Sequence, residues 1–435
     1  MPFINIKHPE QRVLFREAVE TGIGRDQGLF MPETLVPIVN IPALLEMGFV
    51  ERSILILEHI IGTDLDRQVL ESIVTSAFNF PVPLKQVSKN CHALELYHGT
   101  SLAFKDFGAR FMSFCLAALR MSGQTNKPMT ILTATSGDTG AAVAQAFFGQ
   151  PGINVVVLYP KGRITPLQEK LFCTLGGNIR TFAVEDDFDA CQAMVKRSFT
   201  DPELVSALGL NSANSINIAR LLAQVCYYFE AVARLPAGTR PVFSVPSGNF
   251  GNVTAGLIAC AIGLPVNRMI AATNNNDTVP RYLQSGHWDP QPTVATISNA
   301  MDVSQPSNFQ RVLALGASYG VNLEALLVSR ALTDDETREA MRALYDLGYL
   351  ADPHSALGWQ VLQDQLGADE NGEDETGVFL CTAHPAKFRD EVESVLNIKL
   401  DLPEELREVE NRQLLSVNIS NDFSEFKQLL LQAGN

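Results

Sequence analysis

Residues 241–263 read PVFSVPSGNFGNVTAGLIACAIG: a short β-branched run, a loop of small polar residues and a largely apolar helical stretch. The run Pro241–Val245 is typical of a strand buried on both faces, as in parallel sheets covered by helices. Similar apolar runs are MTILTAT at 129–135, INVVVLYP at 153–160 and GVFLCT at 377–382. The first two also lead into helical patterns. The chain therefore predicts βαβ units and an α/β fold class with parallel-type sheets.

Two of the strand-to-helix junctions have loops that suit an anion. They are Ser247–Asn252, reading SGNFGN, and Thr135–Gly140, reading TSGDTG. Glycine lets the backbone approach a ligand closely, and the free N–H groups at a helix start favour negative charge. Neither loop matches the nucleotide motifs GxxxxGK[ST] or GxGxxG. Each loop alone could be only a tight turn, but together they could hold the two ends of a ligand with two anionic groups.

Lys105 lies in the apolar run LAFKDFG at 102–108. Apolar surroundings disfavour the ammonium form, so such a lysine becomes a nucleophilic amine that can form a Schiff base with an aldehyde. Taken alone, such a lysine is more often a surface residue whose stem lies along apolar neighbours. The two anion loops favour the first interpretation, because pyridoxal 5'-phosphate (PLP) has an aldehyde for the lysine and a phosphate for a glycine-rich loop.

The composition excludes several classes of function. The chain has 435 residues, 46% of them hydrophobic, which predicts two or three domains. With 33 Lys and Arg against 48 Asp and Glu, the net charge is −15, which argues against nucleic acid as a partner. No apolar run long enough to span a membrane and no secretory signal is visible, so we expect a cytoplasmic protein. The seven scattered cysteines lack a CxxC pair and are expected to be core residues, with no metal site.

The first 90 residues differ from the rest in pattern. ERSILILEHII at 51–61 and RQVLESIVTSAF at 67–78 have helical periodicity. We therefore predict a small helical N-terminal domain over residues 1–90. A catalytic region over 91–400 would contain two α/β subdomains, the smaller one from roughly 100–230 in part. Residues 401–435 would form a C-terminal extension.

Seven motifs in order carry a resemblance to a known family. They are LAFKDFGARF, TATSGDTGAAVA, PLQEKLFCTLGGNI, GLNSANSINIAR, VPSGNFGN, ATNNNDTVPR and TAHPAKF. The chain resembles the threonine synthases, in their longer bacterial and fungal form, over nearly its whole length. The resemblance implies PLP as cofactor and the tryptophan-synthase-β-like fold type II, with two α/β domains around a cofactor cleft. It also implies conversion of O-phospho-L-homoserine and water to L-threonine and phosphate, by γ-elimination followed by β-addition.

The resemblance further implies roles for individual residues. Lys105 is the catalytic residue, which binds the cofactor and then moves protons. The remaining cofactor-binding residues are Ser247, Gly248, Asn249, Phe250, Gly251 and Asn252 around the phosphate, and Thr382 at the pyridine nitrogen. The substrate-binding candidates are Thr135, Ser136, Gly137, Asp138 and Thr139 for the carboxylate, and Lys161, Arg163, Asn217 and Arg220 for the phosphate.

The sequence leaves other interpretations of the function open. Serine/threonine dehydratases usually have a Ser-Phe-Lys context where this chain has Ala-Phe-Lys, which argues against them. A phospho-lyase that releases 2-oxobutyrate shares many of the motifs, and product analysis separates it from a synthase. A non-catalytic PLP-binding regulatory relative would release no phosphate from the substrate. The oligomeric state is open between monomer and homodimer.

Overall fold

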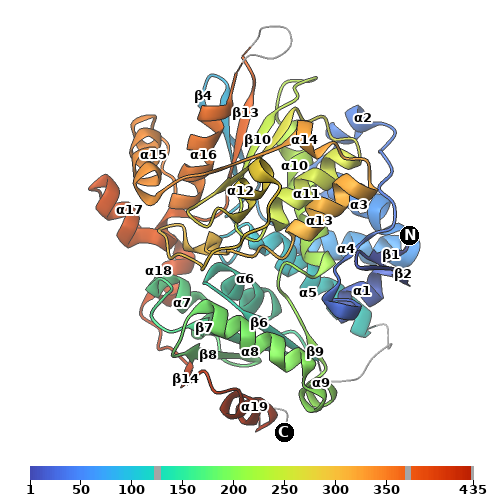
Figure 1. Ribbon diagram of the computed structural model, residues 1–435, viewed down its shortest axis with the longest axis vertical. Helices are drawn as coiled ribbons and strands as arrows, with labels where there is room; N and C mark the ends of the chain where they lie inside the picture. The colour runs from blue at the N-terminus through green and yellow to red at the C-terminus, as the bar shows by residue number, and fades with distance from the viewer. Residues whose placement is uncertain (122–128, 368–373, 433–435) are drawn as a thin grey trace.

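Two open sheets, each with helices on both faces, form the framework of the protein (Figure 1). The computed structural model describes residues 1–121, 129–367 and 374–432. The larger sheet has six strands, in the spatial order β12 (Leu327–Ala331), β11 (Arg268–Thr273), β10 (Val242–Pro246), β13 (Gly377–Cys381), β5 (Cys91–Glu95) and β4 (Leu84–Ser88). Its neighbouring strands are parallel except for the edge pair β4 and β5.

The smaller sheet has five parallel strands, in the order β14 (Val417–Ile419), β8 (Ile179–Val184), β7 (Ile153–Pro160), β6 (Met129–Ala134) and β9 (Leu210–Asn211). The edge strand β14 belongs to the C-terminal segment, so the chain returns from the larger domain to complete the smaller sheet. The α/β fold class with parallel sheets, predicted from the apolar runs, is confirmed.

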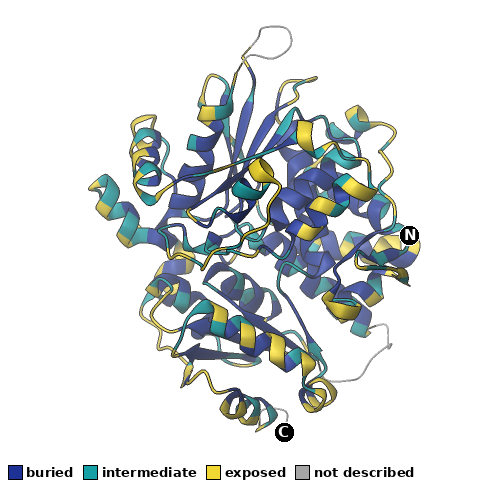
Figure 2. Cartoon of the chain, viewed as in Figure 1, coloured by how far each residue is buried: buried dark blue, intermediate teal, exposed yellow. Residues whose placement is uncertain are grey.

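Helices cover both sheets, as expected for parallel strands. In the larger domain, α16 (Pro353–Gln365) packs on one face of the sheet and α11 (Gly251–Ala261), backed by α10 (Ile218–Ala233), lies on the other (Figure 1). The remaining helical segments of this domain are α5 (Lys105–Met121), α12 (Thr278–Ser285), η3 (Asn299–Met301), α13 (Phe309–Ser318), α14 (Leu323–Leu326), α15 (Asp334–Asp346), η4 (Pro385–Phe388) and α17 (Arg389–Leu396). Strands and covering helices are almost wholly buried (Figure 2).

The smaller sheet shows the alternation of a covered strand. Val155 and Val157 of β7 pack in the same cluster as α6 (Asp138–Phe147), whereas Val156 and Leu158 pack in the cluster that contains α8 (Phe188–Thr200). Successive side chains of a strand point to opposite faces, so the two helices cover opposite sides. The other helices of this domain are α7 (Pro166–Cys173), α9 (Pro202–Leu208), α18 (Glu404–Glu410) and α19 (Phe423–Gln432).

The N-terminal region is not only helical, contrary to the prediction. It contains the two predicted helices, α3 (Phe49–Ile61) and α4 (Arg67–Ala77), together with α1 (Phe15–Thr21), α2 (Ile41–Leu45), η1 (Arg25–Gln27) and η2 (Gly62–Asp64). A three-stranded antiparallel sheet accompanies them, in the order β2 (His8–Val13), β1 (Phe3–Asn5) and β3 (Phe30–Pro32). Two of these strands are three residues long, too short for an alternating pattern to show in the sequence.

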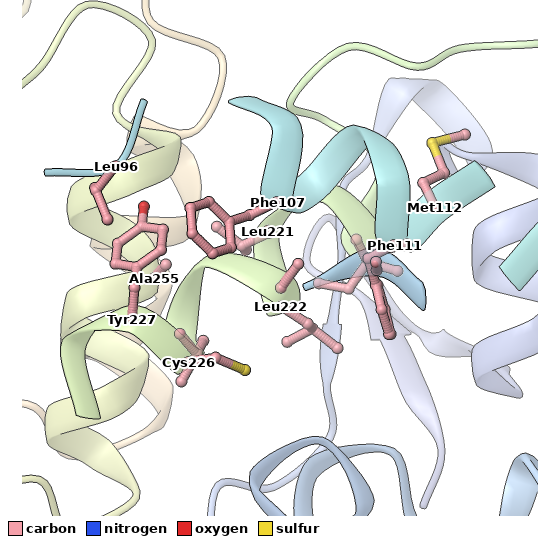
Figure 3. Close-up of a cluster of buried hydrophobic side chains, with 14 of the residues drawn as sticks. Leu96, Phe107, Phe111, Met112, Leu221, Leu222, Cys226, Tyr227 and Ala255 are labelled. Atoms are coloured by element: carbon pink, nitrogen blue, oxygen red, sulfur yellow. The ribbon is translucent and has the colours of Figure 1, made fainter. Parts of the chain in front are cut away.

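The helix that begins at Lys105 is held by a dense apolar cluster. Phe107 and Phe111 of α5 meet Leu221, Leu222 and other residues of α10 (Figure 3). Every residue of α10 from Ile218 to Val232 is buried, including the charged ones. Six of the seven cysteines are buried and all seven are free, as expected for core residues. Within the described ranges no helix is long and apolar enough to cross a membrane.

This packing gives a first prediction. Phe111→Ala removes a fully buried ring from the α5–α10 cluster and should lower the free energy of unfolding by about 3–5 kcal/mol, through lost transfer energy and the cavity left behind. Urea titration followed by circular dichroism measures the change. Val39→Ala, at a fully exposed position, is the matched control and should have little effect. Equal effects for the two substitutions would contradict the packing described here.

Candidate active site

A cavity of about 960 Å³ lies where the carboxyl ends of the two sheets face each other. Its walls include Lys105, both predicted loops and Thr382, which directly follows β13. Loops at the carboxyl ends of parallel strands are the usual position of ligand sites in α/β proteins. Segments that are far apart in the sequence thus meet at one place.

Lys105 is the first residue of α5 and projects into this cavity. The loop before it is fixed to the segment after β13, because Phe104 N donates to Thr382 O over 2.9 Å and Ala103 pairs with Ala383. Burial lowers the pKa of Lys105 to about 8; Asp138 opposes this shift, whereas Lys387 and Arg220 add to it. A minor but usable fraction of the amine is therefore neutral close to physiological pH, and the neutral form is the nucleophile.

The loop Ser247–Asn252 joins β10 to α11. Phe250 has a left-handed backbone with φ of 59°, which turns the chain so that α11 starts at Gly251 without a side-chain cap. The N–H groups of its first turn are thus available to an anion. A Cβ on Gly248 would lie 2.6 Å from the Met301 Cα, so only glycine fits between the loop and η3. Asn249 fixes the loop by donating from Nδ2 to Ser215 Oγ over 2.6 Å.

Asn252 contributes an unused donor to the same wall. Its Oδ1 accepts hydrogen bonds from the hydroxyls of Tyr227, at 2.5 Å, and Tyr228, at 2.7 Å. Its Nδ2 is buried and has no partner within the protein. An unpaired buried donor costs free energy of folding, so this group is a candidate to donate a hydrogen bond to a ligand.

The loop Thr135–Thr139 joins β6 to α6 on the opposite side of the cavity. Thr135 Oγ1 accepts from Gly137 N at 2.9 Å and from Gly140 N at 2.8 Å, which fixes the turn. Gly137 precedes the helix with φ of 129° and offers no side-chain cap. Ser136 and Thr139 line the cavity. Asp138 also borders it, but its carboxylate is engaged by Lys387 and Gln168.

The four residues predicted to bind a substrate phosphate have very different surroundings. Arg220 is buried and lines the cavity, with its Nε unpaired; burial lowers its pKa to about 10. Asn217 is buried as the N-cap of α10 and donates to Val19 O, so its amide serves the fold. Lys161 is exposed and paired with Glu185 at 2.9 Å, and Arg163 is exposed. Of the four, only Arg220 is among the residues that line the cavity.

Comparison with known proteins decides the family. Residues 3–78 match the family model "Threonine synthase N terminus", residues 79–383 match "Pyridoxal-phosphate dependent enzyme", and residues 355–430 match "Threonine synthase, C-terminal". The chain belongs to the threonine synthase family. It is 59% identical to the threonine synthase of Haemophilus influenzae over 100% of both chains. It is 54% identical to that of Escherichia coli over 99% of both.

Solved structures agree with this assignment. The crystal structure of Escherichia coli threonine synthase superposes with a TM-score of 0.94, at 53% identity and full coverage of both chains. A PLP-bound threonine synthase from Brucella melitensis gives a TM-score of 0.90 at 31% identity, again covering both chains fully. The cofactor of this threonine synthase is therefore PLP, as predicted.

The residues present fit that cofactor. A lysine with a lowered pKa would suit its aldehyde, and the uncapped start of α11 with the unpaired Asn252 Nδ2 would suit its phosphate. A Cβ on Gly248 would intrude between this loop and η3. Thr382 provides a neutral hydroxyl in the same cavity.

Sequence reasoning missed part of the lining of the cavity. Residues 300–307 of the long connection between α12 and α13 close one side, and His354 at the start of α16 lies on the wall. His354 Nδ1 is 2.6 Å from Asp352 Oδ2, and both residues are buried. The Asp-Pro-His run is a recognisable helix start, but it gives no sign that the helix points at a site. The connection contains no motif that would reveal its position.

The geometry at Gly248 generates a prediction. Gly248→Ala should displace η3 or the phosphate loop and weaken PLP binding by about tenfold or more, since the added methyl cannot fit at 2.6 Å from a backbone atom. Titration of the cofactor-free protein with PLP, followed by absorbance, measures the dissociation constant. Gly48→Ala, where a Cβ meets nothing within 4 Å, is the control. An unchanged affinity in Gly248→Ala would show that this loop does not bind the cofactor.

Proposed function

We propose that this enzyme converts O-phospho-L-homoserine and water into L-threonine and phosphate. The supporting observation is that one cavity brings together a half-buried lysine, two helix N-termini that no side chain caps, and an arginine with an unpaired nitrogen. PLP would occupy the lysine and one helix N-terminus. The second helix N-terminus and the arginine are left for a substrate with a carboxylate at one end and a phosphate at the other.

We assign the cofactor contacts to the loop Ser247–Asn252, to Lys105 and to Thr382. When bound, PLP supplies an electron sink that makes the proton next to the substrate amino group removable. Lys105 Nζ is the group in the cavity with a pKa near 8, so it can both accept and return protons. The Thr382 hydroxyl is the neutral partner proposed for the pyridine nitrogen, which would leave that nitrogen largely unprotonated and the sink moderate.

The substrate carboxylate is assigned to the loop Thr135–Thr139. Its N–H groups at the start of α6 and the hydroxyls of Ser136 and Thr139 are donors of the kind that a carboxylate accepts. Asp138 does not oppose this role, because Lys387 neutralises its charge at 2.6 Å. This arrangement explains how an acidic residue can belong to a loop that receives an anion.

The substrate phosphate is assigned to Arg220. Its guanidinium is buried and unpaired at Nε, and it can offer parallel donors to phosphate oxygens. In the proposed reaction the Cα and Cβ protons leave and the Cγ–O bond breaks. A proton is then added at Cγ, and water adds with its oxygen at Cβ while a proton returns to Cα. Firm binding of the departing phosphate would stabilise the charge that develops on it.

Lys161 and Arg163 remain sequence-based candidates only, since both are exposed and neither is among the lining residues. Asn217 is proposed to keep the start of α10 in place and thereby to position Arg220 three residues later. The expected cytoplasmic location and the choice between monomer and homodimer also remain proposals.

The first test concerns Lys105 and the product. Borohydride reduction of the PLP-bound enzyme should attach the cofactor to the peptide that contains Lys105, as read by mass spectrometry. With O-phospho-L-homoserine, phosphate and threonine should form in equal amounts, and Lys105→Ala should abolish both. Phosphate with 2-oxobutyrate would instead identify a phospho-lyase, and absence of phosphate release would support a non-catalytic PLP-binding relative.

The second test separates the phosphate candidates. Arg220→Met should lower kcat/KM by about 100-fold or more while PLP content stays unchanged, because truncating a buried charged partner costs several kcal/mol. Arg163→Met at the exposed candidate position should leave kcat/KM close to that of the wild type. A large loss in Arg163→Met, or a loss of PLP in Arg220→Met that matches the loss of activity, would overturn the assignment.

A further inference from the structure

A buried ion pair joins a residue of the cavity wall, Asp138, to a residue behind it, Lys387. Lys387 Nζ is 2.6 Å from Asp138 Oδ1, and the two side chains are 0% and 4% exposed. Gln168 Nε2 donates to the same oxygen over 3.0 Å. Asp138 begins α6 in the smaller domain, whereas Lys387 belongs to η4, which follows the central strand β13 of the larger sheet. Lys387 is not among the residues that line the cavity, so it is not placed to contact a ligand.

The same lysine also holds the loop that leads to Lys105. Lys387 Nζ donates to Ser101 O over 2.8 Å. The next residue, Leu102, has a left-handed backbone with φ of 55°, a conformation that costs a non-glycine residue free energy and persists only where its surroundings fix it. One ammonium group therefore connects the loop before the reactive lysine with the loop proposed to bind the substrate carboxylate.

The charges around Lys105 come from three elements. Asp138 of α6 favours its ammonium form, whereas Lys387 of η4 and Arg220 of α10 oppose it. Asp138 is itself faced by Lys387, by Lys105 and by His354. The Asp138 carboxylate therefore attracts both lysines, and the one that binds it, at 2.6 Å, is Lys387.

We propose that Lys387 and Asp138 are positioning residues that determine how readily Lys105 releases its proton. Lys387 binds the Asp138 carboxylate and so withholds it from Lys105, which leaves the Lys105 amine free to react. The inference rests on the proposed role of Lys105 as the residue that holds the cofactor. The proposed pair acts through Lys105. Of its two members, Lys387 contacts neither substrate nor cofactor.

The pKa directions agree with this geometry. Burial by itself would raise the pKa of Asp138, but the charges of Lys387 and Lys105 outweigh burial and hold it below its ordinary value. Asp138 thus stays ionised throughout the pH range in which Lys105, with a pKa of about 8, loses its proton. Because the carboxylate remains charged between the two lysines, the direction in which each substitution shifts the pKa of Lys105 can be predicted.

A purely structural pair and an electrostatic pair give different results. If the pair only fixes the two loops, Asp138→Asn and Lys387→Met should harm the site in the same direction. If the pair controls the proton on Lys105, the two substitutions act in opposite directions. Loss of the anion destabilises the Lys105 ammonium, whereas loss of the competing cation frees Asp138 to pair with Lys105.

The test measures the reactivity of the Lys105 amine in the full-length chain from which PLP has been removed. Acetic anhydride modifies only neutral amines, and mass spectrometry of the peptide with Lys105 follows the extent of labelling against pH. Near neutral pH, a shift of about one pKa unit should make Lys105 about fivefold more reactive in Asp138→Asn and several-fold less reactive in Lys387→Met. The double variant should return close to the wild type.

A matched control removes another buried carboxylate. Glu230→Gln breaks the Arg52–Glu230 ion pair, in which both side chains are 4% exposed and the atoms are 2.7 Å apart. It should leave the labelling of Lys105 unchanged. If Lys387→Met does not fold, Lys387→Gln removes the same charge while keeping a donor for Ser101 O. Shifts of the same sign in both single variants, no shift in either, or an equal shift in Glu230→Gln would overturn the proposal.

A second readout uses the PLP-bound enzyme. The pH at which the visible absorbance of the bound cofactor changes should fall in Asp138→Asn and rise in Lys387→Met. The labelling experiment needs neither cofactor nor turnover, so its outcome is separate from that of the borohydride test. Failure to trap PLP on Lys105 would contradict the proposed function, whereas opposite labelling shifts could still be observed.

Discussion

A buried carboxylate, that of Asp138, lies among cationic groups at the centre of this enzyme. Burial alone would favour neutral forms of every ionisable group around it, yet the Lys387 ammonium 2.6 Å away keeps Asp138 charged. The pair also joins the two α/β domains, since one partner begins a helix of the smaller domain and the other follows the central strand of the larger sheet. Lys105 lies within the field of both charges.

The rest of the site follows from the direction of parallel strands. Strands β6 and β10 end at the same cavity, and each leads into a helix whose first turn lacks an N-cap side chain. Two helix N-termini, one from each domain, therefore point into the same cavity. Their backbone N–H groups provide two places for anionic groups without the need for charged side chains. The α5–α10 core fixes Lys105 relative to both, because α5 starts at this lysine and α10 contains Arg220.

Elements with a local sequence pattern could be predicted, whereas contacts between segments distant in the chain could not. The strand runs around β6, β7, β10 and β13 and the two small-residue loops could be located because a strand–turn–helix unit has a local pattern. The exposure of Lys161 and Arg163 and the capping role of Asn217 could not be seen, because burial depends on segments distant in the chain. For the same reason nothing in the sequence indicated the ion pair between Lys387 and Asp138, which are 249 positions apart. Nothing in it indicated that His354 lies on the cavity wall either.

We propose that the cavity holds a doubly anionic substrate between the start of α6 and Arg220, with Lys105 in the same cavity. A crystal structure of the PLP-bound enzyme with a phosphonate analogue of O-phospho-L-homoserine tests it most directly. We expect the carboxylate at the N–H groups and hydroxyls of Ser136–Thr139 and the phosphonate at the Arg220 guanidinium. A phosphonate bound beside Lys161 and Arg163, or a ligand bound in the reverse orientation, would contradict it.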